Sequence, residues 1–217
     1  MDHEDSLIEA ARRASRATDR TMKDYRLRYV HDEDDLTGYL LGALRTELSG
    51  AIGHLYWSAA ILRHRKGVAA EEKRFGADIL IHVSLETATL KYSKGVLVQA
   101  KRLERTTYLF RREYETLIDQ CNKMLAVTPA SFVFAYAYSG MRCGSATAIA
   151  GSTSHTPYEQ CVWTSYRFYR ELFLCPIGDP KITSADPRDL PVPSVLKIAG
   201  SDRLGSEGLG GEPEELP

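Results

Sequence analysis

One stretch of the chain decides the fold. It covers residues 76–102 and reads GADILIHVSLETATLKYSKGVLVQAKR. Two apolar runs lie inside it, at residues 79–83 and 95–98, and both are rich in β-branched and aliphatic side chains. Such side chains suit the pleated, half-buried surface of a sheet, so we predict two strands here.

Polar residues stand at the ends of these two predicted strands. Asp78 opens the first strand, and the triplet Gln99-Ala100-Lys101 closes the second. Residues two apart in a strand point to the same face, so we expect Gln99 and Lys101 to project together while Ala100 points the other way. An acid, an amide oxygen and an ammonium at neighbouring strand ends outline a site for a metal ion and a phosphate. That outline is typical of phosphodiester hydrolysis.

Two helices are predicted before this stretch. The first carries a narrow apolar stripe with spacings of three and four: Leu7, Ala11, Ala14, Thr18, Met22 and Tyr25. This stripe favours packing on the body of the same domain, and helix pairing in a dimer is the alternative. The second helix spans about residues 33–49, and its acidic start at residues 32–35 suits the helix dipole. Glu33 lies four residues before Thr37 and seven before Leu40, which turns it toward the inner face.

The remaining elements follow in chain order. We predict a strand at 54–63, a turn or short strand at 86–93, a helix at roughly 104–126 and a strand at 132–138. A strand, a long helix and a strand form a crossover unit, which makes the two strands parallel. Further on, the pattern predicts a short strand at 146–150, a helix at 158–175 and a disordered tail at 200–217.

Composition sets limits on the class of protein. The chain has 217 residues, of which 43% are hydrophobic and 26% charged, as expected for one globular domain. The formal net charge of −1 means that nucleic-acid binding would need a local basic patch. No apolar stretch approaches the roughly 18 residues of a membrane span, and the N-terminus has no secretion-signal pattern, so we expect a cytoplasmic protein. The four cysteines form no C-x-x-C pair, which favours buried reduced thiols.

At this point the order of elements and the motif resemble a known family. The segments Gly76-Ala77-Asp78-Ile79 and Val98-Gln99-Ala100-Lys101-Arg102 are similar to the PD-(D/E)xK nuclease superfamily, and in particular to its Mrr-like branch, which uses Gln-x-Lys. The resemblance covers about residues 30–140. It implies an α/β restriction-endonuclease-like fold, with a mixed central sheet flanked by helices and an α-β-β-β-α-β core. Residues 1–30 would be an N-terminal helical extension, 31–199 the nuclease-like domain and 200–217 the tail.

The resemblance also implies roles for single residues. Asp78 would be the main ligand of Mg²⁺ or Mn²⁺, with the Gln99 amide oxygen and the Ala100 carbonyl as further ligands. Glu33 would reach in from its helix, and its neighbours Asp32, Asp34 and Asp35 are the competing acids. Lys101 would position and help to deprotonate the attacking water, or stabilise the transition state. The alternative is structural: Asp78 accepts turn hydrogen bonds and Lys101 is a solvated strand end.

Basic residues near the motif are candidates for phosphate contacts. We predict nucleic-acid binding by Arg102, Arg105, Lys73 and Arg74, with a solvated helix face as the alternative. The weaker candidates are Gln120 as a supporting residue, with a surface glutamine as the favoured alternative, His82 as a ligand, with a core or sheet histidine as the favoured alternative, and His31. The wider rim would include Arg63, Arg65, Lys66, Arg111 and Arg112.

The expected function is therefore a metal-dependent DNA endonuclease. The family implies phage defence, restriction or repair, and action as a homodimer, within a larger defence assembly, or with a partner protein that supplies specificity. Two alternatives remain open. The fold is retained as a non-enzymatic module that binds nucleic acid or a partner, or the same chemistry acts on RNA.

Overall fold

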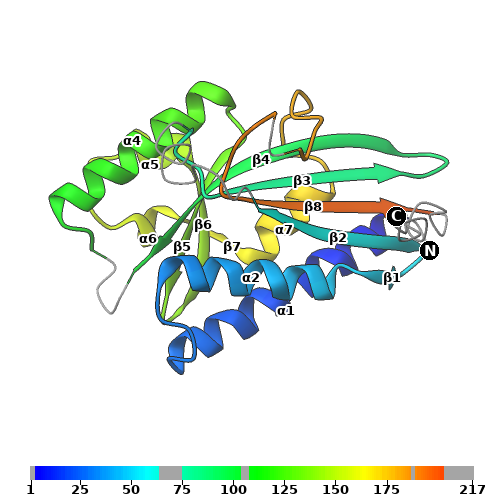
Figure 1. The fold of residues 1–217 in the computed structure, drawn as a ribbon, viewed down its shortest axis with the longest axis horizontal. Helices are drawn as coiled ribbons and strands as arrows, with labels where there is room; N and C mark the ends of the chain where they lie inside the picture. The colour runs from blue at the N-terminus through cyan, green and yellow to red at the C-terminus, as the bar shows by residue number, and fades with distance from the viewer. Residues whose placement is uncertain (1–2, 64–74, 104–107, 187–188, 203–217) are drawn as a thin grey trace, which may run out of the picture.

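A mixed β-sheet runs through the middle of the structure (Figure 1). The computed structural model describes residues 3–63, 75–103, 108–186 and 189–202. In this part of the chain the sheet has eight strands, in the spatial order β1-β2-β8-β3-β4-β5-β6-β7. The strands are β1 (Gly50–Ile52), β2 (Leu55–Arg63), β3 (Ile79–Glu86), β4 (Lys91–Arg102), β5 (Ser131–Ala137), β6 (Gly140–Ser145), β7 (Trp163–Thr164) and β8 (Ser194–Ser201).

Helices cover both faces of the sheet (Figure 1). One face packs against α1 (His3–Arg26), α2 (Glu33–Glu47) and α7 (Ser165–Phe173) in a single apolar cluster. The other face packs against α4 (Arg111–Val127) and α5 (Ala146–Ala150), with α6 (Pro157–Gln160) beside them. Side chains of β4 point alternately to the two faces of the sheet, so Val98 packs in the first apolar cluster and Leu97 in the second.

The predicted α/β class and the mixed sheet flanked by helices are confirmed. The elements α2, β2, β3, β4, α4 and β5 follow one another along the chain as expected. The crossover through α4 does join parallel strands, since β4 and β5 pair in parallel register. Strands β1, β6, β7 and β8 were not predicted. Of these, β8 lies in the middle of the sheet, between β2 and β3, antiparallel to the first and parallel to the second.

The first helix packs on the body of its own chain, which was the favoured expectation. All six residues of its predicted stripe are buried. The Thr18 hydroxyl, which interrupts the apolar stripe, donates to the Ala14 carbonyl and lies 3.2 Å from the Tyr169 hydroxyl of α7. A buried hydroxyl is tolerated here because it has partners.

Several predicted elements are wrong in type or extent. Residues 146–150 form the helix α5 and not a strand, because Ser145 caps it by accepting from the Ala148 amide. The helix predicted at 158–175 is broken, since Trp163 pairs with Cys143 in the sheet before α7 begins. The segment 86–93 divides between the end of β3, a turn and the start of β4.

Boundaries also differ at the ends of two predictions. The helix predicted from about residue 104 begins at Arg111 as α4, and 104–107 lie outside the described residues. The tail predicted from residue 200 starts too early, because Gly200 and Ser201 belong to β8. Its remainder from 203 lies outside the described residues.

No helix in the described ranges is long and apolar enough to cross a membrane. Cys121, Cys143 and Cys161 are buried free thiols as expected, whereas Cys175 is exposed.

Candidate functional site

Asp78 is held between two strands at one end of the sheet. Its amide donates to the Val98 carbonyl at 3.0 Å, and its carbonyl accepts from the Ser194 amide at 3.1 Å. The side chain is fixed as well. Its Oδ2 atom accepts from Gln99 Nε2 at 2.7 Å and from the Ala100 amide at 2.8 Å. We call these three residues, Asp78, Gln99 and Ala100, the Asp78 cluster.

The orientation of the Gln99 amide follows from this contact. An ionised carboxylate only accepts hydrogen bonds, so Gln99 must present its NH₂ group to Asp78. The same Nε2 atom also donates to the Ala100 carbonyl at 2.9 Å. The other end of the amide, Oε1, is buried and has no hydrogen-bond partner among the described residues. A buried oxygen without a donor is costly, and a cation is one kind of partner that would relieve it.

A glycine before Asp78 lets helix α4 approach the cluster. Gly76 has φ +68°, in the left-handed region that favours glycine. A Cβ atom on Gly76 would lie 2.4 Å from the backbone oxygen of Gln120 on α4. The sequence Gly76-Ala77-Asp78 therefore places Asp78 at a position where the backbone turns tightly under α4.

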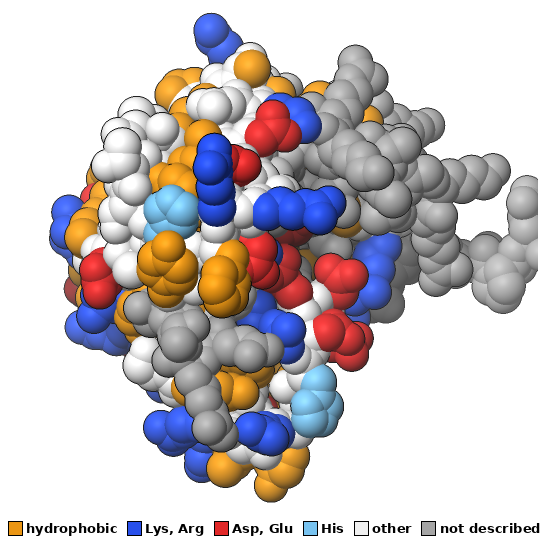
Figure 2. Space-filling view, turned by 90° about the vertical axis from the view of Figure 1, so that its left-hand side faces the viewer, with side chains coloured by type: hydrophobic (Ala, Val, Ile, Leu, Met, Phe, Trp, Pro, Cys, Tyr) orange, Lys and Arg blue, Asp and Glu red, His pale blue; other side chains and the backbone are white. Residues whose placement is uncertain are grey.

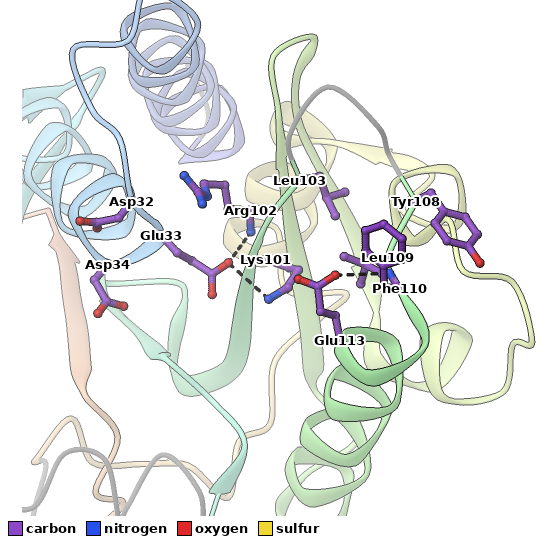
Figure 3. A pocket seen from close by; sticks show the side chains of 10 residues that line it. All are labelled: Asp32, Glu33, Asp34, Lys101, Arg102, Leu103, Tyr108, Leu109, Phe110 and Glu113. Atoms are coloured by element: carbon purple, nitrogen blue, oxygen red, sulfur yellow. Dashed lines mark hydrogen bonds and ion pairs between the residues drawn. The ribbon is translucent and has the colours of Figure 1, made fainter.

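Helix α2 brings an acid to the end of β4. Asp32 is the N-cap of this helix and accepts from the Asp35 amide at 2.8 Å. Glu33, one residue later, points across to the strand (Figure 3). Its Oε2 atom accepts from the Arg102 amide at 2.5 Å and lies 3.7 Å from Lys101 Nζ. The Arg102 guanidinium donates to the His31 carbonyl, so both residues after Ala100 are tied to the start of α2.

A pocket of 670 Å³ opens where α2, β4 and α4 meet. Its walls are shown in Figure 3 and consist of Asp32, Glu33, Asp34, Lys101, Arg102, Leu103, Tyr108, Leu109, Phe110 and Glu113. Acidic side chains outnumber basic ones in this lining. The space-filling view of this end of the molecule shows acidic, basic and hydrophobic side chains gathered close together (Figure 2).

The buried Tyr136 lies behind the site, on β5 opposite Arg102. Burial raises the pKa of its phenol well above the ordinary value, and the charges of Asp78 and Glu33 add to this effect. The phenol therefore stays protonated at neutral pH.

The predicted site residues fall into three groups. Asp78, Gln99 and Ala100 form the Asp78 cluster, and the described lining of the pocket does not include Asp78 or Gln99. Glu33, Lys101 and Arg102 line the pocket. The predicted nucleic-acid contacts Lys73, Arg74 and Arg105 lie outside the described residues, as do Arg65 and Lys66.

The weaker candidates do not line the pocket within the described part of the chain. His82 is a buried sheet histidine whose Nε2 lies 3.0 Å from the Ser93 hydroxyl. Burial lowers its pKa, and the nearby charge of Lys197 acts in the same direction. Gln120 lies on α4 with its backbone against Gly76, and His31 contributes its carbonyl to Arg102.

The oxygen donors of the site suit a hard divalent cation. Mg²⁺ prefers carboxylate and carbonyl oxygens and keeps several waters. Asp78, Glu33, the Ala100 carbonyl and the unpartnered Gln99 Oε1 are oxygen donors of this kind. Within the described ranges, no three or more acidic, histidine or cysteine side chains are grouped to hold a metal. The carboxylates available to a cation are therefore Asp78, which lies beside Gln99 and Ala100, and Glu33, which lies in the pocket.

Of the pocket residues that were not singled out from the sequence, three carry acidic or aromatic side chains: Tyr108, Phe110 and Glu113. Glu113 sits in the first turn of α4, and its carboxylate points toward Lys101 and Glu33 in Figure 3. It accepts from the Phe110 amide at 3.3 Å, and that three-residue spacing was the available sequence signal. Tyr108 and Phe110 are aromatic residues directly before α4, a position where exposed rings are not expected.

No protein-family profile, curated protein or solved structure matches this chain.

Proposed function

We propose that this protein is a metal-dependent endonuclease that hydrolyses DNA phosphodiester bonds. We further propose that its core is restriction-endonuclease-like and closest in motif to the Mrr-like branch. The motif Asp78…Gln99-x-Lys101 and the order α2, β2, β3, β4, α4, β5 support both parts of this proposal.

The observation that carries the proposal is a convergence of distant residues at one end of β4. Asp78 Oδ2 contacts Gln99 and Ala100, which lie more than twenty positions away in the sequence. Glu33 contacts Arg102 and Lys101 from a still greater distance along the chain. Residues predicted as one site from their chemistry thus meet at neighbouring points of one strand.

The residues fit a divalent cation held by oxygen. Asp78 and Glu33 would supply the charged ligands, and Gln99 Oε1 and the Ala100 carbonyl the neutral ones. Such an ion neutralises the phosphate oxygens and lowers the pKa of a bound water. The excess of carboxylates in the pocket repels a phosphodiester, so the site needs a cation before the substrate enters.

The chain's own residues have distinct tasks in this scheme. Lys101 presents an ammonium at the pocket wall, where it orients an attacking water or stabilises negative charge on the transition state. Glu33 holds that ammonium at 3.7 Å and fixes the strand end through the Arg102 amide. The Gln99 amide holds the Asp78 carboxylate in one orientation.

The resemblance extends the proposal to biological role. It implies phage defence or restriction in the cytoplasm, by a homodimer, in a larger defence assembly, or with a partner protein that supplies specificity. A cut in both strands of a duplex needs two sites, and we propose one in the described part of each chain. Mrr-like domains act as effectors of this kind.

The test is cleavage of plasmid DNA by wild type and Lys101→Ala, in EDTA, Mg²⁺ and Mn²⁺. We expect cleavage by wild type with a divalent cation only, and loss of more than about a hundredfold in the variant. Lys91→Ala, at the exposed tip of the β3–β4 hairpin, is the matched control and should cleave normally. Equal cleavage by wild type and Lys101→Ala would refute the site. A parallel assay with single-stranded RNA decides between DNA and RNA as the substrate.

A second candidate is a non-enzymatic module of the same fold. It is favoured by one observation, that Asp78 Oδ2 already has two protein donors and so has a structural task without metal. This candidate predicts salt-sensitive DNA binding or partner binding with no cleavage in any divalent cation.

A further inference from the structure

Two aromatic rings stand exposed at the mouth of the pocket. Phe110 is 75% exposed and Tyr108 is 51% exposed, and both line the pocket that Lys101 and Arg102 also line. Their rings meet edge to face with centroids 6.2 Å apart. Large exposed apolar side chains that flank a polar pocket commonly mark a binding surface.

The rings are held in place from behind. Tyr108 stacks on His155 at a centroid distance of 5.4 Å, and His155 stacks on Tyr114 at 4.3 Å. The backbone is pinned to the same histidine, because the Leu109 amide donates to the His155 carbonyl at 2.8 Å. Tyr114 is anchored in turn by its hydroxyl, which donates to the Ser152 carbonyl at 2.6 Å. Ordering these rings on binding therefore costs little entropy.

Phe110 does not serve the stability of its own helix. It occupies the N-cap of α4, where Ser, Thr, Asp or Asn would accept a hydrogen bond from a backbone amide. A phenyl ring accepts no such bond, and here the ring is also left in water. The Glu113 carboxylate instead accepts from the Phe110 amide at 3.3 Å, and the Phe110 carbonyl accepts from the Tyr114 amide. Phe110 is therefore unfavourable for the helix cap and exposed beside a second aromatic ring, which together favour a role in binding.

The chemistry around the rings selects the occupant. A nucleobase offers a flat face to a ring, and its phosphate would lie near Lys101 and Arg102 once a divalent cation offsets the carboxylates of the same pocket. The pocket volume of 670 Å³ is within the range of sites for small ligands. In an intact duplex both faces of each base are already stacked, so a base reaches such a ring only when it is unpaired or flipped out.

We propose that Tyr108 and Phe110 form a stacking surface for an unpaired nucleobase, so that the site takes single-stranded or locally unpaired DNA. This inference rests on the proposed function for its biological role. The preference for single-stranded over duplex DNA is a binding property, so it is measured separately from cleavage. The stacked base would lie beside Lys101, which positions the adjoining phosphate at the site.

The test measures binding of a short labelled oligonucleotide by fluorescence anisotropy in Ca²⁺, single-stranded or annealed to its complement. The strand carries 2-aminopurine, whose fluorescence falls when it stacks on a ring, and its integrity is verified afterwards. We expect tighter binding of the single strand. Phe110→Leu should weaken it about 5- to 150-fold, the range for losing one base–aromatic stack, and should abolish the quenching. Because Phe110 is exposed, this variant should fold normally.

Tyr56→Leu is the matched control. Tyr56 is an exposed aromatic residue on β2, at the opposite end of the sheet from Asp78, and its loss should change nothing. Tyr108→Leu is a second test at the pocket. Equal affinity for duplex and single strand, or equal single-strand affinity for wild type and Phe110→Leu, would overturn the inference.

The two proposals fail in different ways. Ring-dependent preference for the single strand, in a protein that cleaves no nucleic acid, would uphold the stacking surface and refute the hydrolysis. Cleavage of duplex and single strand at equal rates by wild type and both ring variants would uphold the hydrolysis and refute the stacking surface.

Discussion

The Asp78 cluster predicts that two substitutions at one position have different effects on stability. Gln99 Nε2 and the Ala100 amide both donate to the same oxygen atom of Asp78. Asp78→Ala removes that oxygen, so the Ala100 amide and Gln99 Nε2 both lose a hydrogen bond to it, and Gln99, which is 2% exposed, keeps its bond to the Ala100 carbonyl. Asp78→Asn keeps an oxygen in that place and removes the charge.

The magnitudes follow from the two hydrogen bonds. Bonds to a charged acceptor contribute about 1.5–3 kcal/mol each, and neutral ones about 0.5–1.5 kcal/mol. Asp78 is partly exposed, which favours the lower end of each range. We expect a loss of about 3 kcal/mol for Asp78→Ala and about 1–2 kcal/mol for Asp78→Asn. For a chain of this length that lowers the melting temperature by roughly 6–12 °C and 2–8 °C respectively.

The assay is thermal and urea unfolding in EDTA, followed by plasmid cleavage in Mn²⁺ with the same preparations. Both variants should lose cleavage, because each removes the charged ligand, while only Asp78→Ala loses the full structural contribution. A melting temperature of Asp78→Ala equal to wild type, or one higher than that of Asp78→Asn, would refute the role of the cluster in stability.

Three further predictions concern neighbouring positions. Gly76→Ala should lower the free energy of unfolding in urea by about 2–5 kcal/mol, because its Cβ would collide with the Gln120 carbonyl at a positive φ. Gly140→Ala, the control, is also at positive φ but its Cβ meets no atom within 4 Å, so it should lower that free energy less. Glu33→Gln should reduce plasmid cleavage at least tenfold and leave the free energy of unfolding within about 1 kcal/mol of wild type, because the ion pair with Lys101 is partly solvated. Asp35→Asn on the same helix turn is the control, and equal activity of the two variants would contradict the role of Glu33. Burial lowers the pKa of His82, so wild type should lose stability relative to His82→Gln as the pH falls below about 6.5, the pKa of a histidine in the unfolded chain. Above that pH, the free energies of unfolding of the two proteins should change in parallel. Parallel curves over the whole pH range would contradict this assignment.

Local pattern was enough to predict the centre of the fold. The apolar runs beside Asp78 and before Gln99 identified β3 and β4, because a buried strand needs little beyond its own side chains to be recognised. The long helix between two strands predicted their parallel pairing, since a crossover connection permits little else. Glu33 was preferred among four consecutive acids on helical facing alone, and it is the one whose carboxylate reaches β4.

Long-range pairing was not predictable in the same way. Strand β8 comes from a segment preceded by prolines, and it inserts between β2 and β3 because both edges offer backbone partners that the sequence does not display. The helix predicted at 158–175 fails where Trp163 finds a partner in β6, a tertiary contact that overrides local helical preference. The pocket was not predicted, because only the fold brings Tyr108, Phe110 and Glu113 to the same pocket as Lys101.

Gln99 is the position at which the metal can be tested without reference to activity. In Gln99→Glu a carboxylate replaces the amide that donates to Asp78, so two negative charges face each other in a buried place. Without metal this repulsion should destabilise the fold, or raise the pKa of one of the two carboxyl groups. A divalent cation relieves the repulsion and gains a charged ligand, so it should bind the folded variant more tightly than it binds wild type.

The expected result is a melting temperature that is lower than wild type in EDTA and rises steeply with Mn²⁺ or Mg²⁺. The rise follows the logarithm of metal concentration over the dissociation constant, because the ion binds the folded state alone. Gln120→Glu, partly exposed on α4, is the control and should show no such rise. If Mn²⁺ stabilises Gln99→Glu no more than it stabilises wild type, Gln99 does not face a metal site, and Asp78 and Gln99 are then a structural pair.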